Sequence, residues 1–486
     1  MKLIPALIDG VNHPGEAGAL PVFNPATGVQ IAELQQASRE QVGKAVAAAR
    51  RSFATGEWSR SPWQQRQLLL RRVAGRMRGQ CAELANMQTS ESGLPLATAQ
   101  RQIVAGAAWF DYYADYLSTA PDQAFGQLGD ATTLVLREPI GVCALFSPWN
   151  VPVGLSAIKL APCLAAGNCV VLKPSELTPM VTHALAELIL DCGLPHGALH
   201  CVNGRGDLTG AALSEAPGID MIAFTGGATG GAAVAVQAAL RHLPCVLELG
   251  GKSATVVFAD ADFDLALTGA LASIYGNNGQ ACLAGSRILV QAPIADRFIQ
   301  AFAQKADALR VGDPFDPLTD MGPVVSAAQR DRMHGFFVSA KQDGDQLVCG
   351  GPSDLETNGG YYVRPSAFRV RSRDSRLWRE EVFGPIAAFE VFDDERDAMR
   401  LVNDSDFGLV AYLWTSDLGR AMRCARTIRA GTVLVNTPMR REANAPFGGY
   451  GASGTGREGG RYSWDNFTQG KTIVLQHGTA PGAAHP

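Results

Sequence analysis

Apolar positions along the chain fall into two kinds of pattern, and the change comes near residue 138. Over residues 40–119 apolar side chains recur at helical spacing, and Gly93 stands where one helix should end. Residues 120–137 finish in ATTLVLR, whose alternation is typical of a strand. We therefore expect a helical N-terminal part that leads into a strand.

From residue 138 short and nearly all-apolar runs alternate with helical segments. The predicted strands are GVCALF, NCVVL, GALHCVN, DMIAFT and CVLELGG. Strands that are apolar on both faces and separated by helices indicate a parallel sheet covered by helices. A second α/β alternation, which includes SATVVF and RILVQ, runs from about residue 250 to about residue 445. The final stretch, HGTAPGAAHP, has the composition of a disordered tail.

The composition sets limits on this α/β picture. A chain of 486 residues is expected to form two or three domains. Its net charge of −4 and pI of about 6.1 give no sign of a nucleic-acid or anionic-membrane partner. Because no apolar run suits a membrane helix or a signal peptide, we expect a cytoplasmic protein. The ten cysteines include no C-x-x-C pair, and no metal site is predicted.

Polar and glycine-rich loops follow the five predicted strands of the first alternation. They read SPWN, KPSE, GRGDLTG, TGGATGG and LGGK. Ligands of parallel sheets bind at the carboxyl ends of the strands. Gly204, Gly206 and Gly210 form G-x-G-x-x-x-G, one residue longer than the usual dinucleotide fingerprint. Together the loops predict a nucleotide site, although any one of them alone could be only a turn.

Two of these loops carry candidate polar chemistry. Lys173 and Glu176 directly follow a strand and could clasp a ribose diol, with an exposed surface pair as the alternative. Glu248 ends an apolar strand between two leucines, where desolvation should raise its pKa and suit it to general-base work. The alternative for Glu248 is a structural glutamate in a salt bridge at a domain joint.

Cys282 stands among glycines and amides in YGNNGQACLAGSR, unlike the other nine cysteines. A free thiol has a pKa of about 8.5, so a nucleophilic cysteine needs groups that stabilise its anion. Backbone N–H groups of a glycine-rich turn could do this, and Asn277, Asn278 and Gln280 could add amide dipoles. The alternative, a buried packing cysteine, suits the other nine better.

Seven motifs occur in the order found in the NAD(P)-dependent aldehyde dehydrogenase superfamily: FSPWN, KPSE, FTGG, ELGGK, NNGQAC, EEVFGP and PFGGYGASGTGRE. The chain resembles this superfamily from about residue 22 to about residue 475. The resemblance implies an aldehyde dehydrogenase-like α/β fold, with a Rossmann-type cofactor domain, an α/β catalytic domain and a small β element for bridging. The implied boundaries are 1–119 with 138–248 for the NAD-binding domain, 249–445 for the catalytic domain, and 120–137 with 446–486 for the bridging segments.

The resemblance implies oxidation of an aldehyde to its carboxylic acid with NAD(P)+. Cys282 would attack the carbonyl to form a thiohemiacetal, with Asn150 and the Cys282 backbone N–H as the oxyanion hole. Hydride transfer would leave a thioester, and Glu248 would activate the water that hydrolyses it. Lys159 matches the family lysine near the active site. The alternatives are a CoA-acylating enzyme, which generally lacks the glutamate, and a non-catalytic protein on the same scaffold, which tends to lose the catalytic positions.

The resemblance also implies where the cofactor binds. Lys173 and Glu176 match contacts to the adenine ribose, and Glu381 and Phe383 match contacts to the nicotinamide ribose and ring. NAD is the expected cofactor because Glu176 would repel a 2′-phosphate, while Lys173 and Ser175 leave room for NADP. The other implied cofactor positions are Trp149, Gly206, Gly210, Thr225, Gly226, Gly227 and Leu249.

Two glycines depart from the pattern of the family. Gly227 replaces the serine of FTGS, so the cofactor is expected to bind there through backbone donors. Gly451 replaces the lysine of PFGGYK, and the sequence assigns no consequence to this change.

The substrate is left open between two classes of aldehyde. Val151, Leu155 and Ile158, all aliphatic, would suit a tunnel for an aliphatic or aromatic aldehyde. Arg440 and Arg441 fall in the loop that closes the tunnel in this family, and could bind the distal carboxylate of a semialdehyde unless they face solvent or a neighbouring subunit. Leu283 and Phe447 are the other implied substrate contacts.

Assembly is likewise implied by the resemblance. The strand-like segments near 131–137 and 467–476 match the family's bridging strands, which extend the sheet edge of a partner. A homodimer or a homotetramer is therefore expected.

Overall fold

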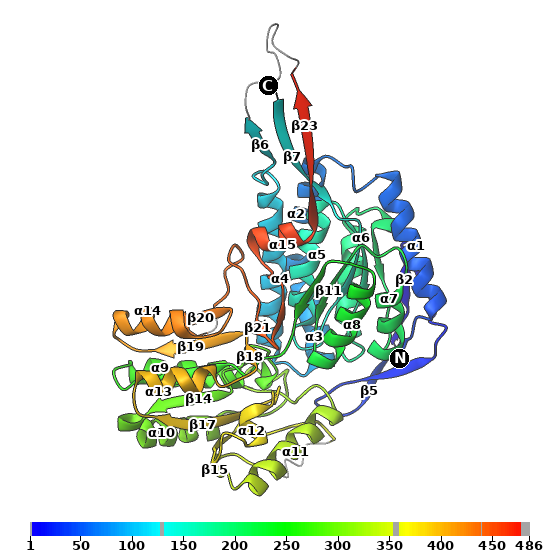
Figure 1. The fold of residues 1–486 in the computed structure, drawn as a ribbon. Helices are drawn as coiled ribbons and strands as arrows, with labels where there is room; N and C mark the ends of the chain where they lie inside the picture. The colour runs from blue at the N-terminus through cyan, green and yellow to red at the C-terminus, as the bar shows by residue number, and fades with distance from the viewer. Residues whose placement is uncertain (1, 127–130, 353–358, 439, 478–486) are drawn as a thin grey trace, which may run out of the picture.

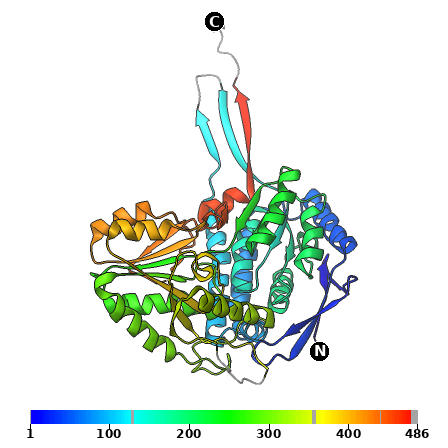
Figure 2. The ribbon, with the colours of Figure 1, turned by 60° about the horizontal axis from the view of Figure 1, so that its bottom comes forward.

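The structure is a computed structural model that describes residues 2–126, 131–352, 359–438 and 440–477. It has two lobes, each with its own large sheet, and a narrow three-stranded arm that stands away from them (Figure 1). The arm still projects when the molecule is turned (Figure 2). Of the tail predicted to be disordered, only His477 lies within the described residues. No helix of the described ranges is both long and apolar enough to cross a membrane.

The first lobe is built on an eight-stranded sheet in the order β22-β12-β11-β8-β9-β10-β2-β3. The five predicted strands are all present and pair in parallel, so the predicted parallel sheet is confirmed. An N-terminal hairpin and β22 add antiparallel edges, which are too short to leave a clear apolar pattern. The strands are β2 (Ala6–Ile8), β3 (Val11–His13), β8 (Val142–Phe146), β9 (Cys169–Lys173), β10 (Leu199–Cys201), β11 (Met221–Thr225), β12 (Cys245–Glu248) and β22 (Gly454–Thr455).

The helices of the first lobe follow the predicted spacing. The N-terminal helical stretch is confirmed, and it begins with a capping box in which Ser38 and Gln41 satisfy each other's backbone N–H groups. Gly93 ends the third helix with a φ of 74°, as predicted. The helices are α1 (Arg39–Thr55), α2 (Trp63–Gly79), α3 (Cys81–Ser92), α4 (Leu96–Tyr116), α5 (Pro152–Ala166), α6 (Pro179–Asp191), α7 (Ala211–Glu215) and α8 (Ala228–Leu240).

The second lobe contains a seven-stranded sheet in the order β15-β16-β17-β14-β13-β19-β20. All of its pairs are parallel except that of β15 with β16. The strands are β13 (Ala254–Val257), β14 (Arg287–Gln291), β15 (Gln346–Cys349), β16 (Ser366–Arg369), β17 (Ile386–Phe392), β19 (Val410–Trp414) and β20 (Thr432–Val435). The helices are α9 (Phe263–Tyr275), α10 (Ala295–Asp307), α11 (Ala327–Asp343), α12 (Arg376–Arg379), α13 (Glu395–Asn403) and α14 (Leu418–Thr427).

The arm and two minor sheets complete the fold. In the arm, the central strand β7 pairs antiparallel with β6 and, along its whole length, with β23. Both segments predicted to be bridging strands are thus strands of one sheet. The remaining elements are β1 (Lys2–Ile4), β4 (Ala19–Phe23), β5 (Gln30–Gln35), β6 (Gln123–Gly126), β7 (Ala131–Pro139), β18 (Phe407–Gly408), β21 (Tyr450–Gly451), α15 (Gly460–Asn466) and β23 (Thr468–Gln476).

The strand order and the short link between the sheets bring one edge of the first large sheet to one edge of the second. In the first sheet β8 leads to β9 and β10 on one side and β11 leads to β12 on the other, which makes a switch point between β8 and β11. Only residues 249–253 then separate β12 from β13. The carboxyl edge of the first sheet therefore meets the amino edge of the second, and Cys282, which precedes β14, belongs to that amino edge.

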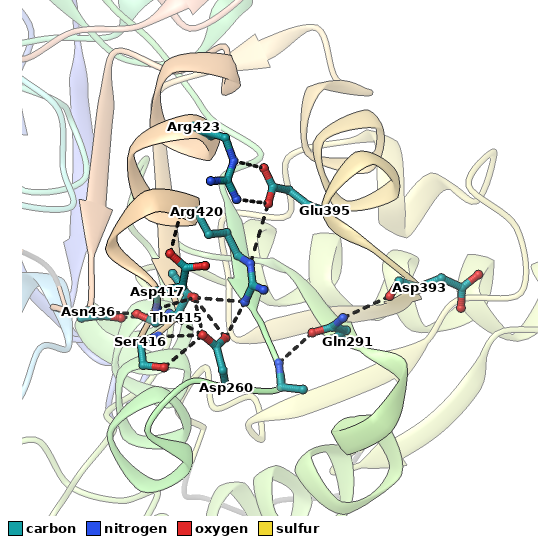
Figure 3. A network of polar contacts seen from close by, with 11 residues as sticks. Asp260, Gln291, Asp393, Glu395, Thr415, Ser416, Asp417, Arg420, Arg423 and Asn436 are labelled. Atoms are coloured by element: carbon teal, nitrogen blue, oxygen red, sulfur yellow. Dashed lines mark hydrogen bonds and ion pairs between the residues drawn. The ribbon is translucent and has the colours of Figure 1, made fainter.

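The opposite, carboxyl edge of the second sheet is closed by a polar network around Asp260 (Figure 3). Its carboxylate accepts hydrogen bonds from Thr415 Oγ1 at 2.9 and 3.0 Å, from Ser416 Oγ at 3.0 Å, and from the N–H groups of Ser416 and Asp417 at 3.2 Å each. Arg420 donates at 2.7 Å. Burial alone would raise the pKa of Asp260, but these hydrogen bonds and the charge of Arg420 lower it.

We expect Asp260→Ala to lower the stability of the protein by about 1–3 kcal/mol, because it leaves several donors without an acceptor. The measurement is the midpoint of thermal unfolding. Since the folded-state pKa of Asp260 is lowered, its contribution is present above the ordinary carboxyl pKa and fades as the pH falls through the folded value. Asp296→Ala is the matched control, because this exposed carboxylate has only a 3.4 Å pair with Arg369. Equal losses in the two variants would contradict the assigned role.

Candidate active site

The turn that carries Cys282, between α9 and β14, has an unusual backbone. Asn277, Asn278 and Gly279 all adopt left-handed φ values, of 56°, 56° and 71°. Asparagine and glycine adopt this conformation at the lowest cost. A side chain at Gly279 would also collide with the backbone of Pro385. The sequence NNG is therefore explained by the backbone conformation of the turn that carries the thiol.

Amide side chains of this turn anchor it to distant backbone groups. Asn278 donates to the carbonyl oxygens of Gly93 and Pro323 at 2.9 Å each. Gln280 accepts from the N–H of Val325 at 3.0 Å. Both side chains are buried, so they fix the position of the turn instead of supplying the predicted amide dipoles to the thiol.

Asn150, which lies just before α5, is tied to the same turn. Its Nδ2 donates to the carbonyl of Gln280, two residues before Cys282, at 2.9 Å. Asn277 Nδ2 donates to that carbonyl at 2.9 Å and to the carbonyl of Asn150 at 3.1 Å. An amide nitrogen has two donor hydrogens, and the bond to Gln280 uses one of them. The buried Asn150 therefore offers a second donor close to the thiol.

Glu248 is the last residue of β12 and is buried between β11 and β22. Burial and the charge of Glu458 raise its pKa to about 8, while Lys159, Arg441 and Arg457 act in the opposite direction. This is the direction that its apolar strand predicts. Its Oε1 is buried and has no hydrogen-bond partner within the described part of the chain. Among the residues that the structure describes, Glu248 is thus in no salt bridge, and its raised pKa makes it a stronger base than an ordinary glutamate.

Lys159 is fully buried on α5 and forms an ion pair with Glu458, which is also buried. The other carboxylate oxygen of Glu458 lies 3.9 Å from Arg441 Nη2. Glu458 belongs to the quoted motif PFGGYGASGTGRE, but nothing in its spacing indicates a role, and only the fold brings it to Lys159.

The two arginines of the predicted tunnel loop have different surroundings. Arg440 has a side chain that is 73 % exposed and pairs with Glu442 at 2.7 Å, so it is a surface residue. Arg441 turns inward, with its guanidinium over the rings of Trp109 at 5.2 Å and Phe447 at 4.2 Å. Its Nε and Nη2 are buried and lack any hydrogen-bond partner among the residues that the structure describes. These two nitrogens form the edge of a guanidinium that can bind a carboxylate bidentately.

Cys282 itself is half-buried. Burial and the carboxylates of Glu381 and Glu248 raise the pKa of its thiol to about 12, while Arg441 and a backbone N–H lower it. The thiol is therefore protonated at neutral pH, contrary to the expectation that the glycine-rich turn would stabilise its anion. The apolar wall beside it consists of Leu283, Leu409, Val410, Tyr412, Leu434 and Phe447.

The three aliphatic positions around the start of α5 differ in burial. Val151 and Leu155 are half-buried and accessible. Ile158 is 4 % exposed and belongs to the core of the first lobe. Of the three, Ile158 is placed by the structure in the packing of the core.

The residues predicted to hold the adenine ribose lie at the carboxyl end of β9. Lys173 is buried, and its Nζ lies 3.6 Å from the partly exposed carboxylate of Glu176, so the two are not an exposed surface pair. A side chain at Gly210 would contact Lys173 at 3.5 Å, whereas Gly206 is exposed and has open space around it. Ser175 Oγ accepts from a nearby backbone N–H and caps the local turn.

The loop after β11 leads to the N-terminus of α8. Thr225 Oγ1 is buried and has no hydrogen-bond partner in the described ranges, and the N–H of Gly226 donates to the carbonyl of Glu248 at 3.1 Å. The side chain of Leu249 packs against Gly231 of α8. A helix N-terminus next to an unpartnered hydroxyl fits the pyrophosphate of a dinucleotide.

The two unusual glycines have separate explanations. Gly227 is the N-cap residue of α8, makes no side-chain cap, and has open space where a side chain would stand. This space agrees with an anion that approaches the backbone directly. Gly451 has a φ of 56°, and a side chain there would crowd the carbonyl of Asp406. The backbone of β21 therefore favours glycine at this position.

The residues predicted to contact the nicotinamide side come from both lobes. The rings of Trp149 and Phe383 meet edge to face, with centroids 5.0 Å apart. Phe383 has a left-handed φ of 56°, a strained conformation for a bulky residue. Glu381 accepts from the N–H of Gly251 at 2.8 Å, which links it to the loop between β12 and β13.

A thiol, an amide donor and a basic carboxylate lie where two α/β lobes meet, beside strand ends and a helix N-terminus that suit a dinucleotide, which is the arrangement of a nucleotide-dependent enzyme with a covalent intermediate. Comparison with known proteins agrees. Residues 13–473 match the model of the aldehyde dehydrogenase family. The chain belongs to this family, and the predicted aldehyde-oxidising activity is confirmed at that level.

Relatives and solved structures match almost the whole chain. The 5-carboxymethyl-2-hydroxymuconate semialdehyde dehydrogenase of Escherichia coli is 38 % identical over 95 % of this chain and 99 % of its own length. The 2-aminomuconic 6-semialdehyde dehydrogenase of a Pseudomonas species is 39 % identical over 93 % and 94 %. The structure of betaine aldehyde dehydrogenase from Staphylococcus aureus in complex with NAD+ is 33 % identical, has a TM-score of 0.95, and covers 98 % of each chain.

Proposed function

We propose that the protein oxidises an aldehyde that also carries a carboxylate, with NAD as the hydride acceptor and Cys282 as the nucleophile. The observation that carries the substrate assignment is the buried edge of Arg441, which has no hydrogen-bond partner in the described part of the chain and interacts electrostatically with Cys282. Asn150 and Glu248 have the roles of oxyanion donor and general base, and Lys159 supports the base through Glu458.

The proposed reaction begins with removal of a proton from Cys282, because burial keeps the thiol protonated at neutral pH. Glu248 is the base, since its carboxylate interacts with the thiol and has a pKa of about 8. The sulfur then bonds to the aldehyde carbon. The second amide hydrogen of Asn150 and the backbone N–H of Cys282 hold the oxyanion, and one such donor contributes roughly 3–4 kcal/mol. NAD, when bound, accepts the hydride of this carbon.

Hydrolysis of the resulting thioester is the second task of Glu248, after the proton taken from Cys282 has passed to solvent. Its carboxylate takes a proton from a water molecule, the oxygen of that water bonds to the acyl carbon, and the carbon–sulfur bond breaks to release the thiolate of Cys282. The burial and basicity of Glu248 support water rather than CoA as the acyl acceptor.

Several residues at the carboxyl ends of the first sheet's strands fit NAD. Lys173 and Glu176 would hold the adenine ribose, the N-terminus of α8 the pyrophosphate, and Glu381 the nicotinamide ribose. NAD is favoured over NADP because the carboxylate of Glu176 would repel a 2′-phosphate. Two structurally similar proteins, betaine aldehyde dehydrogenase and indole-3-acetaldehyde dehydrogenase, were solved in complexes with NAD+, which supports the same cofactor here.

Overall similarity leaves the substrate class undecided, so side chains must decide it. Two relatives are named for semialdehydes of muconic acids, and a semialdehyde carries a carboxyl group as well as its aldehyde. Others at 35 % and 37 % identity are named for betaine aldehyde and for retinal. Arg441 favours the first class, because a buried guanidinium edge without a partner costs free energy that a carboxylate would restore. Val151, Leu155, Leu283 and Phe447 would contact the rest of the substrate.

Removal of the base should separate the two halves of the reaction. We expect Glu248→Gln to accumulate the acyl-enzyme, visible by mass spectrometry, and to lower turnover at least about a hundredfold. Cys282→Ala should form no acyl-enzyme at all. In the wild type, turnover should rise as the pH passes about 8, because Glu248 must be ionised to accept a proton. Glu442→Gln, a surface change, is the control. Wild-type turnover in Glu248→Gln would refute the assignment.

The substrate class can be tested with kcat/KM for succinic semialdehyde and for benzaldehyde. We expect the wild type to prefer succinic semialdehyde. At a pH high enough to ionise Glu248 in both enzymes, Arg441→Met should lower kcat/KM for the semialdehyde about 10- to 100-fold, the value of a charge-assisted hydrogen bond, and change benzaldehyde little. Arg440→Met should change neither, because Arg440 lies on the surface. A strong wild-type preference for benzaldehyde would eliminate the acid-bearing substrate.

We further infer a homodimer or a dimer of dimers that forms through the arm. β23 is an edge strand of the arm, with Val474 63 % exposed, and β20 is an edge strand of the second lobe. Unpaired strand edges of this kind invite pairing with another chain. Light scattering should give a mass of two or four chains, and Val474→Lys should shift it toward one. A monomeric wild type at micromolar concentration would contradict this assembly.

A further inference from the structure

Glu248 is surrounded by charged groups from several elements. Lys159 comes from α5, Arg441 from the loop that follows β20, and Arg457 and Glu458 from the segment between β22 and α15. Thr225, at the end of β11, faces it from the neighbouring strand with an uncharged hydroxyl.

The cations in this set are not equivalent. Lys159, Arg441 and Arg457 all favour the ionised form of Glu248, Lys159 most strongly. Lys159 forms its ion pair with Glu458, and Arg457 donates to the carbonyl oxygens of Gly449 at 3.0 Å and Gly456 at 2.6 Å. The guanidinium of Arg441, in contrast, makes no hydrogen bond through Nε or Nη2 within the described residues. Arg441 is therefore the one of these three cations with buried N–H groups left for a second carboxylate.

Aromatic packing keeps Arg441 in this state. Trp109 and Phe447 hold the guanidinium between them, and its Nη2 stops 3.9 Å from Glu458, beyond hydrogen-bond distance. Its free edge can then take a substrate carboxylate without first breaking another hydrogen bond.

We propose that the general base and the substrate carboxylate share the cation Arg441, so that an acyl group bearing a carboxylate moves the ionisation of Glu248 to higher pH. The proposal rests on the proposed function for the identity of the base. When no carboxylate is bound, the charge of Arg441 favours the ionised form of Glu248. A bound carboxylate cancels that charge, and Glu248 must then lose its proton without this help.

The step that reports on the coupling is hydrolysis of the acyl-enzyme. The water loses a proton to Glu248, its oxygen bonds to the acyl carbon, and the bond from that carbon to Cys282 Sγ breaks. Because only the ionised carboxylate accepts the proton, the pH at which hydrolysis reaches half its maximal rate measures the ionisation of Glu248 directly.

In the test, Cys282 is acylated with p-nitrophenyl hexanoate or with mono-p-nitrophenyl adipate. The two acyl groups have the same chain length, and only the adipyl group carries a terminal carboxylate. Attack by sulfur expels p-nitrophenolate, and decay of the acyl-enzyme is followed by intact-protein mass spectrometry across pH, with NAD present. For the wild type we expect the half-maximal pH of the adipyl-enzyme to lie about one unit above that of the hexanoyl-enzyme.

Two substitutions of Arg441 separate its charge from its hydrogen bonds. Arg441→Met should raise the half-maximal pH of the hexanoyl-enzyme by about one unit, to the wild-type adipyl value. Arg441→Lys keeps the charge and should leave the hexanoyl value low, although it loses the bidentate edge. Arg440→Met, on the surface, should change nothing.

The outcomes distinguish this coupling from the proposed function. Equal hexanoyl values in the wild type and Arg441→Met would overturn the coupling, whatever the substrate preference. Equal adipyl and hexanoyl values in the wild type would overturn the part played by the substrate. If Arg441→Met shifts the half-maximal pH of the hexanoyl-enzyme but the wild type prefers benzaldehyde, the coupling is supported and the proposed substrate class is refuted. A hexanoyl-enzyme that decays without any dependence on Glu248 would refute the base itself.

Discussion

The site depends on one electrostatic constraint, which is the burial of two carboxylates, Glu248 and Glu458, close to each other. Such a pair is stable only if cations or protons compensate it. Lys159 and Arg441 supply the cations, and the raised pKa of Glu248 supplies the proton. The four side chains come from α5, β12, the loop after β20 and the segment before α15, so this compensation forms only where the chain, on leaving the second lobe, packs back onto the first.

The turn that carries Cys282 is held by hydrogen bonds between the two lobes. Asn150 of the first lobe bonds to the carbonyl of Gln280, and Asn278 bonds to Gly93 and Pro323. The left-handed backbone of Asn277 to Gly279 costs conformational free energy, and these hydrogen bonds offset that cost. The amide side chains thus position the nucleophile through hydrogen bonds to the backbone. The thiol itself remains protonated until a base takes its proton.

The two sheets contribute opposite edges to the candidate site. The first offers the carboxyl ends of β8, β9, β11 and β12, where helix N-termini and loops suit a dinucleotide. The second offers its amino edge, since the network of Asp260 closes its carboxyl edge (Figure 3). A cofactor bound on one lobe would therefore face a thiol presented by the other, and the short link of residues 249–253 keeps the two edges together.

Local pattern was sufficient for much of this protein. The all-apolar strands predicted the parallel core, Gly93 ended its helix, and motifs of high specificity singled out Cys282, Asn150 and Glu248. The tertiary structure alone decided that Arg441 turns inward with two buried nitrogens while Arg440 is exposed, that Glu458 pairs with Lys159, and that Ile158 packs in the core. The reason is physical: periodicity and turn chemistry arise between neighbours in sequence, whereas burial, unpartnered donors and shifted pKa values arise from contacts between residues hundreds of positions apart.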